Sequence, residues 1–181
     1  MRVVGGKYRH RLLEWPDDSL HIRPTKDRIR EAIFNALGDL TGMVALDLYS
    51  GSGAMGIEAL SHNAIKSIFV DINPVALRTT RKNITSLSIP DSDYDVLSIP
   101  DAKAIEYLRE KGRRVDLVFL DPPYKEGKYQ EIVDLLIKNE ILNENSIIVI
   151  ESDKEIVISE SCYQRRRDYK YGEIKVAILW R

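Results

Sequence analysis

The stretch Asp47-Leu-Tyr-Ser-Gly-Ser-Gly-Ala-Met-Gly56 decides the fold of this chain. It continues a nearly uninterrupted apolar run, residues 43–49, which is typical of a strand buried on both faces. Its glycines 51, 53 and 56 have the spacing G-x-G-x-x-G, which lets a strand-to-helix turn approach a ligand closely and offer it amide donors. In an open parallel sheet, such a turn lies at the carboxyl ends of the strands, where ligands bind. The stretch therefore predicts an α/β fold with a ligand site at one sheet edge.

Helical and strand patterns alternate on both sides of this turn. Strands are predicted at residues 43–49, 67–70, 94–98, 115–120 and 146–150, and helices at 25–38, 54–61, 74–87, 101–111 and 129–139. The tail, 155–181, is rich in β-forming residues. This order predicts a mostly parallel seven-stranded sheet that ends in an antiparallel hairpin. Residues 1–24 are expected to form a small, basic, β-hairpin-like extension, and residues 25–181 the main domain.

The composition excludes several classes of protein. With 44% hydrophobic and 30% charged residues, the chain is typical of a globular domain. One cysteine and three scattered histidines predict neither an internal disulfide nor a metal site. We find no apolar run long enough to cross a membrane and no signal peptide, so we expect a cytoplasmic protein without membrane contact.

Basic residues are concentrated near the N-terminus, although the formal net charge is only −1. Residues 1–11 carry four arginines and lysines and no acid, and residues 22–30 carry four against Asp27 alone. This distribution favours contact with a polyanion at one place on the molecule. A merely solvated charged face is the alternative.

A second acidic residue, Asp71, ends the second predicted strand. A carboxylate at this position accepts hydrogen bonds from the ribose hydroxyls of a nucleotide. The glycine turn and Asp71 together indicate a nucleotide-containing ligand. They suit a nicotinamide or flavin enzyme and a methyltransferase equally well.

The tetrapeptide Asp121-Pro-Pro-Tyr124 follows the fourth predicted strand and separates these alternatives. The prolines hold a rigid loop at the same sheet edge as the glycine turn. The Asp121 carboxylate and the Pro122 carbonyl can accept hydrogen bonds from the exocyclic amine of a base and localise its lone pair for methyl transfer. Tyr124 offers a ring on which an extruded base can stack. The alternative is that this tetrapeptide is an ordinary turn, but its position at the same sheet edge as the glycine turn favours a catalytic role.

Taken together, these residues resemble the class I S-adenosylmethionine-dependent methyltransferases that act on base amines. Two further stretches, residues 3–9 and 23–31, resemble the bacterial RsmD-type enzymes, which methylate N2 of a guanine in 16S ribosomal RNA. The resemblance covers nearly the whole chain through Ser152. It implies a Rossmann-like fold, S-adenosylmethionine as cofactor, and ribosomal RNA as partner, within the small subunit or an assembly intermediate.

The resemblance also implies site residues. The catalytic loop is expected to comprise Asp121, Pro122, Pro123 and Tyr124. The cofactor is expected to contact Asp47, Tyr49, Gly51, Gly53, Asp71, Ile72, Asp101 and Ala102. RNA phosphate is expected to contact Arg9, Arg11, Arg23, Lys26, Arg28 and Arg30. For Arg28 and Arg30, ion pairs with Asp27 or Glu31 are the stronger alternative. Arginines 165–167 are a possible second RNA contact.

Three other functions stay open from the sequence. A DNA adenine-N6 methyltransferase shares the Asp-Pro-Pro-Tyr chemistry, but the chain has no insertion for a target-recognition domain. A non-catalytic RNA-binding protein could keep the same fold, and a nicotinamide oxidoreductase is more distant. We expect Trp15 and Trp180 to pack rather than to stack on bases, and Cys162 to lie in a strand.

Overall fold

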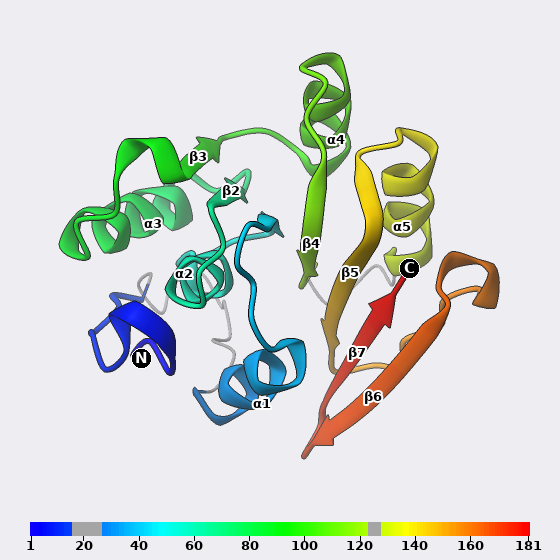
Figure 1. Ribbon diagram of the computed structural model, residues 1–181, viewed down its shortest axis with the longest axis horizontal. Coiled ribbons are helices and arrows are strands. Elements are labelled where there is room, and N and C mark those ends of the chain that lie inside the picture. Colours follow the sequence, from blue (N-terminus) through cyan, green and yellow to red (C-terminus); the bar gives the residue numbers. More distant parts are fainter. Residues whose placement is uncertain (16–26, 123–127) are drawn as a thin grey trace.

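The computed structural model describes residues 1–15, 27–122 and 128–181. Their strands form a seven-stranded sheet in the order β3-β2-β1-β4-β5-β7-β6 (Figure 1). The strands are β1 (Val44–Leu48), β2 (Lys66–Val70), β3 (Tyr94–Leu97), β4 (Val115–Leu120), β5 (Leu142–Ser152), β6 (Arg165–Tyr171) and β7 (Ile174–Trp180). β1 to β5 are parallel, whereas β7 runs antiparallel to both β5 and β6. The predicted α/β fold with a C-terminal antiparallel hairpin is confirmed.

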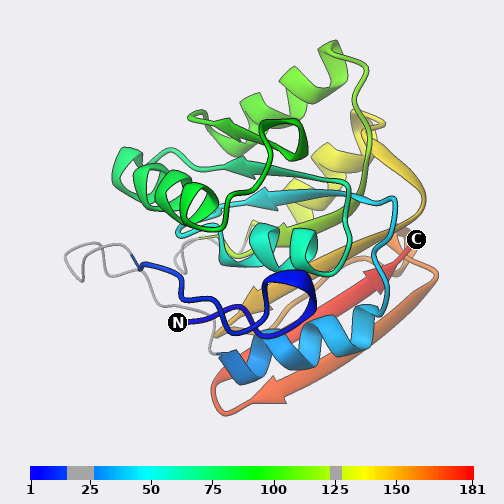
Figure 2. The same ribbon diagram turned by 60° about the vertical axis from the view of Figure 1, so that its left-hand side comes forward.

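Five α-helices of the described residues cover the sheet in two layers. They are α1 (Asp27–Leu37), α2 (Ala54–Ser61), α3 (Pro74–Ser86), α4 (Asp101–Glu110) and α5 (Tyr129–Lys138). α4 and α5 pack on one face, and α1, α2 and α3 lie on the other (Figure 2). None of the helices in the described ranges is long and apolar enough to cross a membrane.

Side chains of the central strands alternate between these two layers. Leu46 and Val118 join the core under α4 and α5, whereas Ala45 and Leu117 join the core under α1. Because both faces are covered, β1 and β4 carry nearly continuous apolar runs, as the sequence indicated. The alternation also fixes the direction of every side chain at the carboxyl ends of these strands.

The fifth strand begins earlier than the sequence predicted. β5 starts at Leu142, but its pairing with β4 is interrupted between Leu142 and Ile147. Asn145 has a φ of 60°, a left-handed conformation that asparagine tolerates better than most residues. The irregular pairing explains why polar residues precede the apolar run from Ser146 onward.

Residues 1–13 pack against α2 and α3. They include a 3-10 helix, η1 (Gly6–Tyr8), and a single antiparallel bridge between Arg2 and Leu12. Val3 and Leu13 are buried in one cluster with side chains of α2 and α3. The division into an extension and a main domain stays a prediction, because residues 16–26, which include the expected junction between the two, lie outside the described ranges.

A buried carboxylate, Glu58 of α2, holds this N-terminal segment in place. Its Oε1 accepts a hydrogen bond from the Gly5 amide at 2.8 Å and another from the Val4 amide at 3.1 Å. Its Oε2 lies 3.7 Å from Nε of Arg30, and both side chains are fully buried. The N-terminal segment, α1 and α2 are therefore joined through one charged network.

Candidate functional site

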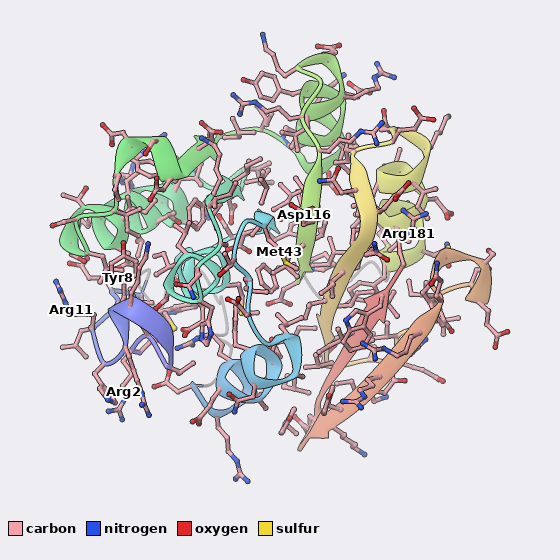
Figure 3. The ribbon with its side chains drawn as sticks, in the orientation of Figure 1. Arg2, Tyr8, Arg11, Met43, Asp116 and Arg181 are labelled. Carbon is pink, nitrogen blue, oxygen red and sulfur yellow. The ribbon has the colours of Figure 1, made fainter. Side chains whose placement is uncertain are left out.

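A pocket opens at the carboxyl ends of β1, β4 and β5. Its floor is formed by the glycine turn, and its acidic side chains are Asp47, Asp121 and Glu151. Apolar walls come from Trp15, Ile33 and Met55. At the opposite edge of the sheet, Met43 precedes β1 and Asp116 is the second residue of β4; both residues are labelled in Figure 3. The pocket thus lies at the sheet edge at which the sequence predicted a ligand.

The glycine turn has the backbone conformation that its sequence requires. Gly51 and Gly53 have φ values of 55° and 79°, in the left-handed region. A Cβ atom on Gly53 would lie 2.8 Å from Cγ2 of Thr80 and 3.2 Å from Cε1 of Phe69. Both glycines are therefore needed to bring the main chain of the turn close to the pocket.

A hydrogen bond joins Asp47 of β1 to the end of the glycine turn. The Oδ2 atom of Asp47 accepts it from the Gly56 amide at 2.9 Å. The pKa of Asp47 is raised to about 7, mainly because the group is buried. The hydrogen bond from Gly56 lowers the pKa, and the negative charge of Asp71 raises it further. Asp47 is thus an acidic group that ionises near neutral pH and favours a positive charge beside it.

Two carboxylates beyond β2 and β3 stand where the adenosine half of the cofactor was expected. Asp71 accepts hydrogen bonds from the Gly51 amide at 2.9 Å and from the Asn73 amide at 2.8 Å. Each of its oxygens keeps a further lone pair for a ligand hydroxyl. Asp101 accepts a hydrogen bond from the Tyr49 hydroxyl. Ile72 is 69% exposed and available for contact with a planar ring.

Asp121 follows β4 directly and lines the same pocket as Asp47. Burial raises its pKa well above the ordinary value, and the charges of Glu151, Asp47 and Asp153 raise it further. Pro122 is buried behind it. Pro123 and Tyr124 lie outside the described residues.

Two hydroxyl groups in the turn fit a polar ligand. The Oγ atoms of Ser50 and Ser52 are buried and have no hydrogen-bond partner within residues 1–15, 27–122 and 128–181. Both residues line the pocket. Buried polar groups are normally satisfied, so these hydroxyls indicate that a ligand with donors or acceptors completes the site.

Sequence reasoning missed part of this pocket. Glu151, Ile33 and Met55 were not predicted as site residues, and Trp15 was expected only to pack. Glu151 carried a usable signal, because it follows an apolar strand directly, as Asp71 and Asp121 do. Among the described residues, no group of three or more His, Cys, Asp or Glu side chains is arranged to hold a metal ion.

The predicted RNA-contacting residues separate into three groups. Arg9, Arg11 and Arg28 are exposed, and the guanidinium of Arg11, labelled in Figure 3, donates a hydrogen bond to the Ser86 carbonyl at 2.8 Å. Arg23 and Lys26 lie outside the described residues. Arg30 corrects the prediction, because it is fully buried and pairs with Asp27 at 3.0 Å as well as with Glu58.

The arginines near the C-terminus are partly engaged within the protein. Arg165 lies over the ring of Trp180 at 3.9 Å, and Arg166 pairs with Asp168 at 2.8 Å. Cys162 is buried in a 3-10 helix, η4 (Glu160–Cys162), and not in a strand as the sequence suggested.

Comparison with known proteins places the whole chain in one family. The family model described as Conserved hypothetical protein 95 matches residues 1–180. The chain belongs to this family. The chain is also similar to the Ribosomal RNA small subunit methyltransferase D of Escherichia coli strain K12, with 34% identity over 86% of this chain and 76% of that protein. The RsmD-type resemblance is thereby confirmed.

Solved structures agree with this membership. The yhhF protein of Escherichia coli, provisionally named a methyltransferase, has a TM-score of 0.83 and 29% identity, and the match covers 100% of this chain and 97% of that one. An RNA methyltransferase from Salinibacter ruber, solved with S-adenosyl-L-homocysteine, has a TM-score of 0.65 and 18% identity over 87% of this chain and 93% of that one. This second likeness shows the fold alone. The fold is that of the class I methyltransferases.

Proposed function

We propose that this protein transfers a methyl group from S-adenosylmethionine to the exocyclic N2 amine of a guanine in small-subunit ribosomal RNA. One observation carries the proposal: the Asp121 carboxylate lines the same pocket as the glycine turn and Asp47. A methyl donor held by the turn and a base amine held by Asp121 would therefore meet in one cavity.

The residues of the pocket fit this methyl donor. S-adenosylmethionine supplies an electrophilic methyl group on a positively charged sulfonium. A bound sulfonium would favour the ionised forms of Asp47 and Asp121, whose carboxyl groups line the pocket, and the remaining lone pairs of Asp71 suit the ribose hydroxyls. The unpartnered hydroxyls of Ser50 and Ser52 provide further polar contacts beside the turn.

The acceptor amine needs activation, because its lone pair is delocalised into the base. Hydrogen bonds from the amine to Asp121 and to the Pro122 carbonyl would localise that lone pair. As the new N–C bond forms and the S–C bond breaks, positive charge develops on the nitrogen. The Asp121 carboxylate stabilises this charge and, with its raised pKa, is suited to take the proton that the nitrogen then releases.

Ribosomal RNA is the favoured substrate for two reasons. Relatives at 34% identity are named for methylation of small-subunit ribosomal RNA. The exposed side chains of Arg9, Arg11 and Arg28 supply positive charge for the RNA backbone. A chain of 181 residues offers little surface for reading sequence, so a cytoplasmic small subunit or its assembly intermediate is the proposed target.

A labelled-methyl assay tests the proposal. The protein is incubated with methyl-labelled S-adenosylmethionine and, in separate reactions, with small subunits that lack the modification or with unmethylated DNA, and the nucleic acid is digested to nucleosides. We expect the label in N2-methylguanosine. Label in N6-methyladenine of DNA would favour the DNA methyltransferase, and absence of label from both nucleic acids would favour a non-catalytic RNA-binding protein.

A further inference from the structure

The carboxylate of Glu151 lies in the pocket beside Asp121. In the parallel pairing of β4 and β5, Phe119 is opposite Val149 and Leu120 is opposite Ile150. Asp121 and Glu151 each come directly after these pairs, on adjacent strands that lie about 4.8 Å apart. Because side chains alternate along a strand, both carboxylates point to the sheet face shared by Phe119 and Val149. All four residues line the pocket.

The backbone holds Glu151 rigidly. It is the tenth residue of β5, Leu142–Ser152, and it pairs with Val176 of β7 on the other side. The residue is only 7% exposed. Glu151 also contributes to the raised pKa of Asp121, as expected of two carboxylates near one another. A carboxylate in this position is a fixed acceptor and not a mobile surface charge.

A pair of neighbouring acceptors matches one edge of guanine. On that edge, the N1–H and the N2 amine both donate hydrogen bonds, and they are adjacent. At the position where guanine has N1–H, adenine and cytosine have an unprotonated ring nitrogen, which is an acceptor. A carboxylate opposite that nitrogen could not form a hydrogen bond with it. A buried group left unpaired in this way is costly, which makes it an effective device for rejecting the wrong base.

We propose that Glu151 is the specificity-determining residue of this site, accepting a hydrogen bond from N1–H of the target guanine while Asp121 accepts one from its N2 amine. The inference rests on the proposed function, because it names the residue that recognises the proposed base. The apolar walls from Trp15, Ile33 and Met55 lower the local dielectric and strengthen both contacts.

The test compares two bases that share the N2 amine. Small subunits are reconstituted with either guanine or 2-aminopurine at the methylated position; 2-aminopurine keeps the amine but lacks N1–H. We expect wild type to methylate guanine with a kcat/KM at least about 10-fold higher than 2-aminopurine. In Glu151→Gln, kcat/KM for guanine should fall by about 10-fold, because the amide oxygen that then accepts from N1–H carries no negative charge and makes a weaker hydrogen bond. Transfer to 2-aminopurine should change less than about 3-fold.

Two variants and one binding measurement serve as controls. Glu155→Gln removes an exposed carboxylate shortly after the same strand and should leave both rates unchanged. The affinity of Glu151→Gln for S-adenosylmethionine, measured by calorimetry, should stay within about 3-fold of wild type if the residue faces the base. Glu151→Asp keeps a carboxylate and should keep the preference for guanine even if transfer is slower, which tests the inference should the glutamine variant not fold.

The outcomes separate this inference from the function on which it rests. An equal fall on guanine and 2-aminopurine in Glu151→Gln, or an unchanged ratio between them, would overturn the role of Glu151 and leave the proposed function standing. A wild-type protein that labels neither RNA would overturn the proposed function, and the inference with it.

Discussion

Replacing Asp47 by asparagine tests how much the burial of this carboxyl group lowers the stability of the protein as the pH rises. Asp47 is 3% exposed, and its carboxylate accepts a hydrogen bond from the Gly56 amide. Asparagine has nearly the same shape and can still accept this hydrogen bond, but it carries no charge. The substitution therefore isolates the free energy of ionising a buried carboxyl group.

The sign of the effect follows from the direction of the shift. The pKa of Asp47 rises from 3.8 to about 7 on folding, so the folded state binds its proton more tightly than the unfolded state does. Wild-type stability from this group is therefore greatest below pH 4 and falls as the pH rises toward 7. At about 1.4 kcal/mol per pKa unit, the full loss is about 4 kcal/mol, of which about 2–3 kcal/mol falls between pH 5 and pH 8.

Urea unfolding of wild type and Asp47→Asn at pH 5 and pH 8 measures this difference. We expect the variant to gain about 2–3 kcal/mol relative to wild type on going from pH 5 to pH 8. Glu155→Gln, which removes an exposed carboxylate, should show the same difference from wild type at both pH values. If the gap between wild type and Asp47→Asn were independent of pH, the raised pKa and the argument from burial would be wrong.

Three further predictions address the turn, the N-terminal network and the basic surface. Gly53→Ala should lower the free energy of unfolding by about 1–3 kcal/mol and weaken binding of S-adenosylmethionine, because its φ is 79° and the new Cβ meets Thr80; calorimetry that finds unchanged affinity would contradict this. Glu58→Ala should cost about 3–5 kcal/mol in chemical unfolding, since it removes the fully buried carboxylate beside Arg30 and the acceptor of the Val4 and Gly5 amides, while the pair of Arg30 with the partly exposed Asp27 remains; a loss under 1 kcal/mol would show that the network contributes little. Arg9→Ala should keep its stability within about 0.5 kcal/mol and reduce the salt dependence of RNA binding by about one unit of slope; an unchanged slope would remove Arg9 from the proposed RNA contact.

Most of the sheet was predictable because its pattern is local. The apolar runs of β1 and β4 are buried by helices on both faces, and the parallel topology places Asp47, near the end of β1, and Asp121, directly after β4, at one edge of the sheet. Gly53 was predictable for the same reason, because a strand-to-helix turn with a left-handed residue favours glycine.

The features that were missed depend on contacts between distant parts of the chain. Arg30 was expected to contact RNA or, as the stronger alternative, to pair with Asp27 or Glu31. Its buried partner Glu58 lies 28 residues away on another helix, and the sequence does not show that both side chains are buried. The early start of β5 was hidden by polar residues in an irregular pairing around Asn145. Trp15 reaches the pocket through a tertiary contact that no periodicity reports.

The rate of methyl transfer by Asp121→Asn in a single turnover measures directly whether the Asp121 carboxylate activates the acceptor amine. Enzyme saturated with S-adenosylmethionine is mixed with unmodified small subunits, and the rate of label transfer is compared with wild type at equal cofactor occupancy. We predict a rate lower by about 100- to 1,000-fold, with cofactor affinity within about 3-fold. A rate within about 3-fold of wild type would show that the Asp121 carboxylate does not activate the amine.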